Sequence, residues 1–417
     1  MRCNDQGNFQ ASLFKTKGEK AMAKKIIKKI DQEGIPSLHF FGERQRPDRP
    51  EKVLDRRFVL GDRKIPAELQ KLKSRMSVYM YTEGGEEKPK VQIERVKTSG
   101  KGSTWRVDLP ILEKGQHVGH ALMGQKATRE KPEVFLRQTN PKTPFTSYRP
   151  SWIDATFAPK IVSRERFRAM RRINGRPVNP LYVFPPDDRW SFRDAAWPWG
   201  LVGKVFTSAG WTGSAALIGD RIIATAGHVV PWDDSPWWMR FVPAFYDGSS
   251  LHGVGVESYV SDARGYDVNG DVTGYDWAVC RLYEPLGSWL GYFGYNGYDD
   301  DWEDDPYWSI IGFPGAVAGG QRPSFQGSIT SFDTDGDSNG GLEIETRGDL
   351  TPGNSGGPMF GWWSGDPRLI GVVSGEEEDW SPGFWPWDWA DVERGNVVAG
   401  GSGFTNLMAW GRTNWPL

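Results

Sequence analysis

The chain has 417 residues, which is too long for one compact core and predicts two or three domains. No run of about 18 apolar residues occurs that could span a membrane, and the N-terminus lacks the apolar segment of a secretory signal. The two cysteines, Cys3 and Cys280, do not make a disulfide framework, so we expect a cytoplasmic rather than a secreted protein.

The formal net charge of −2 conceals a division of the chain into two halves of opposite charge. Residues 1–186 contain 39 Lys and Arg against 20 Asp and Glu, whereas residues 187–417 contain 12 against 33. Tryptophan divides in the same way, because 19 of the 21 lie after residue 187. So abrupt a change predicts a domain boundary, and the opposite charges predict an intramolecular contact between the two halves.

The N-terminal half contains three segments of different composition. Residues 1–50 are polar and basic and predict an arm, within which 17–34 could form a short amphipathic helix. A solvated, disordered arm is favoured over one that contacts nucleic acid or a membrane surface. Residues 51–172 mix helical and strand patterns and predict a small α+β domain, and the four prolines of 173–189 predict a linker.

From residue 190 to residue 417 the pattern is that of short strands. Apolar, β-branched and aromatic runs such as "RIIATAGHVV", "WAVCRLY" and "WSIIGFP" alternate with Gly, Pro, Asn and Asp turns. Many short strands with regular turns predict an antiparallel barrel or sandwich. The late segment "FTNLMAWGR" predicts one short C-terminal helix.

Three motifs within this region carry candidate chemistry. His228 follows an apolar strand in "ATAGHVV", Asp276 precedes one in "YDWAVCRL", and Ser355 lies among small residues in "TPGNSGGP". A buried carboxylate needs a polar partner, and an imidazole that provides it has a second nitrogen free to take a proton from a serine. Asp267 and Asp271, in a polar loop, are alternatives to Asp276.

In the order His, Asp, Ser, these motifs resemble the chymotrypsin-like serine peptidases. The segment that begins with "DDRW" also resembles the bacterial glutamyl-endopeptidase-like branch, so the resemblance covers about residues 187–417. It implies an all-β catalytic domain of two antiparallel six-stranded barrels with a short C-terminal helix. It also implies that Ser355 is the nucleophile, His228 the general base and Asp276 the partner of His228, with an oxyanion hole made by the amides of Gly353 and Ser355.

The same resemblance implies where a substrate would bind. Val373, Ser374, Gly375 and Glu376 would form the strand beside the substrate. Asp349 lies six residues before Ser355, where trypsins keep the aspartate that recognises Lys or Arg, although its side chain could equally face elsewhere. Glutamate specificity is in doubt, because the glutamate-specific branch has a histidine where Val373 falls.

The resemblance also bears on control of the enzyme. We expect the N-terminal α+β region to act as a pro-segment or regulatory domain of a zymogen. A cut between Arg172 and Ile173 is one possible trigger, but Asn354 stands where trypsins carry the aspartate that binds the new amine. Because Asn354 is neutral, that ion pair is not expected here.

The expected activity is that of a serine endopeptidase acting on a protein or peptide. The alternatives are a catalytically idle binding module on the same fold and an esterase with the same triad. No Cys/His cluster has zinc spacing, and we expect no cofactor. Acidic turns such as 333–340 could hold a structural calcium ion, but they lack the glutamate that an EF-hand loop requires at its twelfth position.

Overall fold

The computed structural model describes most of the chain from residue 50 onward. The described residues are 50–51, 58–74, 93–97, 103–107, 124–129, 145–163, 171–173, 176–178, 183–184, 186–234, 236–268, 272–381 and 391–416. They lie in one compact unit, Pro50–Leu417. The predicted basic arm, including the possible helix at 17–34, lies outside the described residues.

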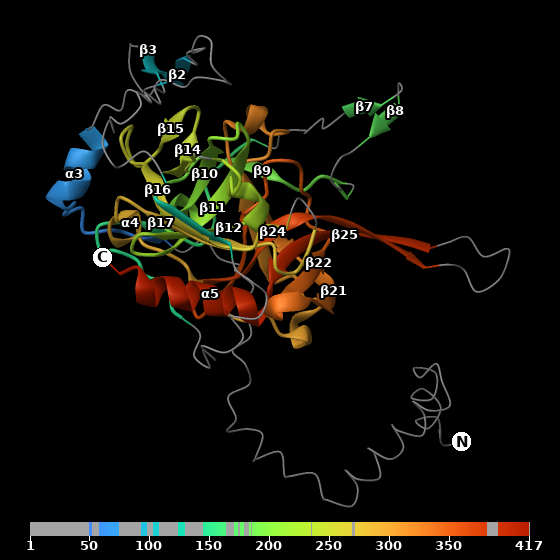
Figure 1. Cartoon of the computed structure of the whole chain (residues 1–417). Coiled ribbons are helices and arrows are strands. Elements are labelled where there is room, and N and C mark those ends of the chain that lie inside the picture. The colour runs from blue at the N-terminus through green and yellow to red at the C-terminus, as the bar shows by residue number, and fades with distance from the viewer. Residues whose placement is uncertain are drawn as a thin grey trace, which may run out of the picture. The chain divides into compact units, whose positions relative to one another are not determined.

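Six antiparallel strands close into a barrel at the centre of this unit (Figure 1). They are β10 (Val202–Thr207), β11 (Thr212–Gly219), β12 (Ile222–Thr225), β13 (Met239–Pro243), β16 (Ser258–Gly265) and β17 (Ala278–Leu282). The hydrogen-bonded order is β13-β10-β11-β12-β17-β16, and pairing of Arg240 with Tyr259 joins β13 to β16 and closes the ring. The first of the two predicted six-stranded barrels is therefore confirmed.

A second, ten-stranded sheet contains most of the later strands. They are β19 (Trp308–Gly312), β20 (Ser324–Ile329), β21 (Ser331–Gly336), β22 (Leu342–Thr346), β23 (Pro358–Trp363), β24 (Asp366–Ser381) and β25 (Asp391–Gly400). The order along the sheet is β21-β22-β25-β24-β23-β19-β20, continued by β9 (Trp190–Phe192) and β6 (Ile161–Ser163), while β18 (Gly294–Tyr295) pairs with β24. Only Thr330 separates β20 from β21, so β20, near one end of this order, continues directly into β21 at the other end.

Aromatic side chains fill much of the interior of both sheets. Trp199 and Trp277 lie in the larger hydrophobic cluster, and Trp302 and Trp308 in the smaller one, each with no more than 1% of its surface exposed. Burying one large apolar side chain contributes roughly 2–3 kcal/mol, so each of these four residues is a substantial contributor to its own cluster. This explains why tryptophan is concentrated after residue 187.

Several elements that precede residue 190 pair with strands of the two sheets. β4 (Lys126–Arg129) runs parallel to β16, and β6 is antiparallel to β9. The compact unit begins at Pro50, and the domain boundary expected at 173–189 stays a prediction. The remaining two-stranded pairs are β1 (Phe58–Val59) with β5 (Ala155–Thr156), β2 (Ile93–Lys97) with β3 (Ser103–Val107), β7 (Arg171–Ile173) with β8 (Arg176–Val178), and β14 (Phe245–Tyr246) with β15 (Ser249–Ser250).

Few helices occur among the described residues. The longest, α5 (Gly401–Asn414), is the predicted C-terminal helix and lies against the barrel (Figure 1). Its Arg412 donates from Nη2 to the Phe293 carbonyl at 2.6 Å. The other α-helices are α3 (Ala67–Ser74) and α4 (Leu286–Leu290). Five single turns of 3-10 helix complete the set: η2 (Trp199–Leu201), η3 (Gly227–Val229), η4 (Asp300–Trp302), η5 (Ala318–Gly320) and η6 (Ser338–Gly340).

Candidate functional site

His228 and Asp276 meet because their strands are neighbours. His228 lies in η3, three residues beyond the end of β12, and Asp276 lies two residues before the start of β17, which pairs antiparallel with β12 through Thr225 and Ala278. The Nδ1 atom of His228 lies 2.6 Å from Oδ2 of Asp276, and the His228 backbone N–H donates to Oδ1 at 2.9 Å. One carboxylate therefore holds both the ring and the main chain of the histidine.

A third hydrogen bond to Asp276 comes from the second sheet. The hydroxyl of Ser374, on β24, donates to Oδ2 of Asp276 at 2.7 Å. Asp276 has no exposed surface, so these donors compensate for the loss of water around its carboxylate. Burial of His228 lowers its pKa, but the charge of Asp276 and the hydrogen bond to it raise the pKa more, and the net shift is upward.

Ser355 lies in a tight turn of the loop between β22 and β23. Gly353 and Gly356 have φ angles of +103° and +78°, a conformation that glycine adopts without strain. The turn is closed by hydrogen bonds from Asn354 N–H to the Thr351 carbonyl and from Gly357 N–H to the Asn354 carbonyl. Within the described part of the chain, the amides of Gly353 and Ser355 donate to no protein group. Both therefore remain available to a ligand.

A cleft of about 590 Å³ brings these groups together. His228 lines it from the first barrel, and Gly353 and Ser355 line it from the loop before β23. The imidazole is partly accessible, with 29% of its side-chain surface exposed. Trp211, Trp232, Asp233, Asp234 and Asp267 also line this cleft.

Comparison with known proteins finds similarity over the same part of the chain. A family model described as Trypsin matches residues 191–385. Glutamyl endopeptidase of Bacillus licheniformis is 27% identical over 188 residues, which cover 44% of this chain and 56% of that protein. Residues 191–385 are therefore similar to the trypsin-like peptidases, and the chain spans about half the length of the glutamyl endopeptidase that it matches.

Two solved structures are also similar to this chain. One is a Glu endopeptidase in complex with MPD, with 18% sequence identity and a TM-score of 0.41 over 56% of this chain and 100% of that one. The other is the protease Anisep from Arthrobacter nicotinovorans, with 19% identity and a TM-score of 0.36 over 50% and 93%.

The four residues of the strand that was predicted to lie beside a substrate have different surroundings in the structure. Val373 is 1% exposed and its backbone pairs with Gly356 and Gly357, while the Ser374 hydroxyl faces Asp276. A side chain on Gly375 would meet Val272, and Glu376 is half-buried. None of these four residues lines the cleft described above. Their proposed contacts with a substrate stay predictions.

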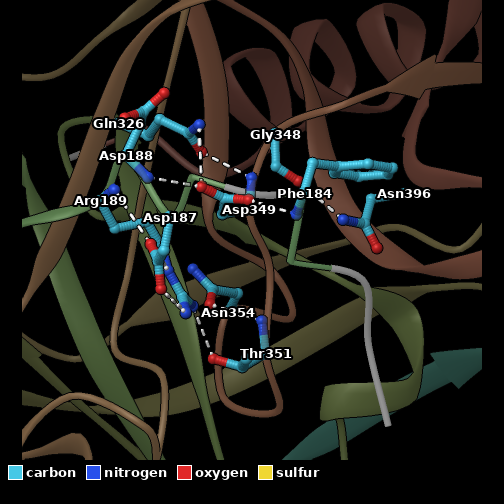
Figure 2. A network of polar contacts seen from close by, with 10 residues as sticks. All are labelled: Phe184, Asp187, Asp188, Arg189, Gln326, Gly348, Asp349, Thr351, Asn354 and Asn396. Carbon is cyan, nitrogen blue, oxygen red and sulfur yellow. Dashed lines mark hydrogen bonds and ion pairs between the residues drawn. The ribbon is translucent and has the colours of Figure 1, made fainter. Parts of the chain in front are cut away.

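Asp349 is buried and hydrogen-bonded to the segment that precedes β9. It is 2% exposed, and its two oxygens accept hydrogen bonds from the backbone N–H groups of Phe184 and Asp188 at 2.7 and 2.8 Å (Figure 2). Burial raises the pKa of Asp349 to about 6, although these two hydrogen bonds oppose the shift. The side chain is therefore occupied by the segment that precedes β9. Its role in recognising Lys or Arg stays a prediction.

Of the two acidic residues that were alternatives to Asp276, the structure describes one. Asp267 lines the cleft and forms an ion pair with Arg129, whereas Asp271 lies outside the described residues. Among the described residues, no group of three or more His, Cys, Asp or Glu is placed to hold a metal ion. The structural calcium ion therefore stays a prediction.

None of the helices described in this chain is long and apolar enough to cross a membrane.

Two polar contacts at this site were missed by sequence reasoning. Ser374 was predicted to lie in the strand beside a substrate. Its contact with Asp276 was not predicted, because the sequence of a strand does not show which neighbour a hydroxyl group reaches. Arg129, from β4, pairs with Asp233 and Asp267, both of which line the cleft. The opposite charges of the two halves were the only sequence signal for this second contact.

Proposed function

We propose that this trypsin-like chain is a serine endopeptidase that uses His228, Asp276 and Ser355. The observation that carries the proposal is the convergence on one cleft of a carboxylate-bound imidazole, a serine in a glycine turn, and two unpaired backbone amides. A buried Asp276 holds His228 with Nδ1 as its proton donor, which leaves Nε2 as the base.

The proposed reaction has two halves. The Ser355 Oγ forms a bond to the carbonyl carbon of the scissile peptide as its proton passes to Nε2 of His228. The amides of Gly353 and Ser355 stabilise the negative oxygen, and the imidazolium then gives the proton to the departing amine as the C–N bond breaks. The acyl half of the substrate is then held as an ester on the Ser355 Oγ. Water, activated by His228, attacks this ester and releases the acyl half as a carboxylic acid, and Ser355 regains its proton from His228.

Labelling with a fluorophosphonate, read by intact mass on the full chain, tests this proposal. We expect one added label on the parent chain and on Ser402→Ala, which changes an exposed residue of α5, and none on Ser355→Ala. Labelling of the Ser355→Ala variant would contradict the assignment of the nucleophile. If the parent chain hydrolyses esters but no peptides, the chain is an esterase with the same triad.

We also propose that the N-terminal region controls access to the cleft. In support, β4 pairs with the barrel beside the cleft, and its last residue, Arg129, forms ion pairs with Asp233 and Asp267. Arg129 and Asp233 have 46% and 85% of their side-chain surfaces exposed, so these contacts are screened by water and individually weak. Such a contact would compete with a substrate without blocking the site permanently.

A further inference from the structure

We propose that Phe184 and residues 187–189 hold the Ser355 loop, the turn at 349–357 between β22 and β23, in its catalytic geometry in the uncleaved chain. Arg189 is the positioning residue that connects the two. This inference rests on the function proposed above. It goes beyond that function by naming what orders the oxyanion amides and by making a cut at Arg172–Ile173 unnecessary. Figure 2 shows the polar network concerned.

Arg189 is the centre of this network. Its side chain is 1% exposed, and its guanidinium donates from Nε and Nη2 to the two oxygens of Asp187 at 3.0 and 2.9 Å. The remaining Nη1 donates to the hydroxyl of Thr351 at 2.8 Å. Asp187 neutralises and orients the buried cation, so the third contact is directed at one atom of the Ser355 loop.

Thr351 connects Arg189 to the candidate oxyanion amides. Its backbone N–H donates to Oδ1 of Asn354 at 3.2 Å, and its carbonyl accepts from the Asn354 N–H at 3.0 Å. Asn354 is 1% exposed and lies between Gly353 and Ser355. A shift of Thr351 would therefore be passed to both of the amides that are proposed to bind the oxyanion.

Asp349 provides a second anchor to the same segment. Its oxygens accept from Phe184 and Asp188, and its own N–H donates to Oε1 of Gln326 at 2.6 Å. The two anchors lie on either side of Leu350: Asp349 binds Phe184 and Asp188, and Thr351 binds Arg189. The loop that precedes Gly353 is thus fixed at two points by the chain that leads into β9.

These contacts come from within a continuous chain. The donors to Asp349 are ordinary peptide N–H groups, which need no free amine, and Asn354 is a neutral amide that cannot form an ion pair with an ammonium group. The cation in the network is the side chain of Arg189, which is present before any cut. Order in the Ser355 loop is therefore expected without proteolysis.

The test uses the full-length chain and measures the rate of fluorophosphonate labelling together with kcat and KM for a peptide. We expect Arg172→Ala, which prevents the candidate cut, to label as fast as the parent while intact mass shows an uncleaved chain. Arg189→Ala should lower the labelling rate and kcat about tenfold or more with little change in KM, because the oxyanion amides are displaced. Thr351→Val, which keeps the shape of the side chain, should lower both about threefold to tenfold, and Arg189→Lys should retain part of the rate.

Arg368→Ala is the matched control. Arg368 is also a buried arginine that bonds the aspartate two residues before it, through Nε to Asp366 at 2.8 Å, but it lies on β24 away from the Ser355 loop. If Arg189→Ala and Arg368→Ala label at the same rate, the positioning role of Arg189 is wrong. If only shortened chains label, the inference fails while the proposed function stands. If no form labels, the proposed function itself fails.

Discussion

The Ser374 hydroxyl lies 2.7 Å from the Asp276 carboxylate and joins the second sheet to the histidine-bearing barrel. Asp276 is fully buried, so removal of this donor leaves one of its oxygens less well compensated. We expect Ser374→Ala to lower the free energy of unfolding by about 1–3 kcal/mol and to lower kcat several-fold without a large change in KM. Chemical denaturation and peptide kinetics would measure both. A variant with unchanged kcat would limit this serine to a structural role.

The pH dependence of activity should follow His228. Its pKa is raised above the usual 6.5, because the effect of Asp276 exceeds that of burial. The imidazole must be neutral to accept the Ser355 proton, so kcat/KM should fall as the pH drops through this raised pKa. Asp276→Asn removes the charge, so the fall of kcat/KM on the acid side of the pH profile should move to lower pH. The maximum rate should also be lower. A pH–rate profile with the same limb in both proteins would contradict the assignment.

The pH dependence of stability should carry a contribution from Asp349. Its pKa in the folded protein is about 6, above the ordinary value of 3.8, so the folded state binds this proton more tightly than the unfolded state does. The stability contributed by this proton is present below about pH 4 and is lost as the pH rises to about 6. Relative to Asp349→Asn, the parent chain should lose unfolding free energy across that range and stay level above it. Parallel curves in urea titrations from pH 4 to pH 8 would contradict the shift.

The backbone at Gly353 should not tolerate a side chain. Its φ is +103°, and a Cβ atom there would lie 2.6 Å from the carbonyl oxygen of Phe313. We expect Gly353→Ala to remain folded but to lose at least about a hundredfold in kcat, because one oxyanion amide is displaced. Gly336→Ala is the control, since a Cβ at that position meets nothing within 4 Å. Equal activity of the two variants would contradict the role of the Gly353 amide.

Loss of the Arg129 ion pairs should raise activity modestly. We expect Arg129→Ala to increase kcat/KM about twofold to fivefold at low salt, and the gain should shrink at high salt, where exposed ion pairs are screened. Lys126→Ala, on the same strand and exposed, should change little. Peptide kinetics at two salt concentrations would measure this difference. A salt-independent gain in both variants would point to loosening of β4 and contradict competition at the cleft.

Much of this protein followed from the sequence by itself. Alternating apolar runs and turns predicted an antiparallel barrel or sandwich and the C-terminal helix, because strand and helix periodicity are local properties. The resemblance to a family of peptidases narrowed this to six-stranded barrels. His228, Asp276 and Ser355 were candidates for the same reason, since each lies at a strand end or in a glycine turn. The division of charge indicated that the two halves differ.

Only the tertiary structure decided which groups meet. The pairing of β12 with β17 brings His228 to Asp276, and the return of β24 adds Ser374, although these residues are far apart in the chain. The spacing of Asp349 left open whether its side chain faces a substrate or elsewhere, and in the structure its oxygens accept hydrogen bonds from Phe184 and Asp188. Spacing fixes where a residue lies along a loop, whereas the partner of a buried polar group depends on the non-local packing that excludes water around it.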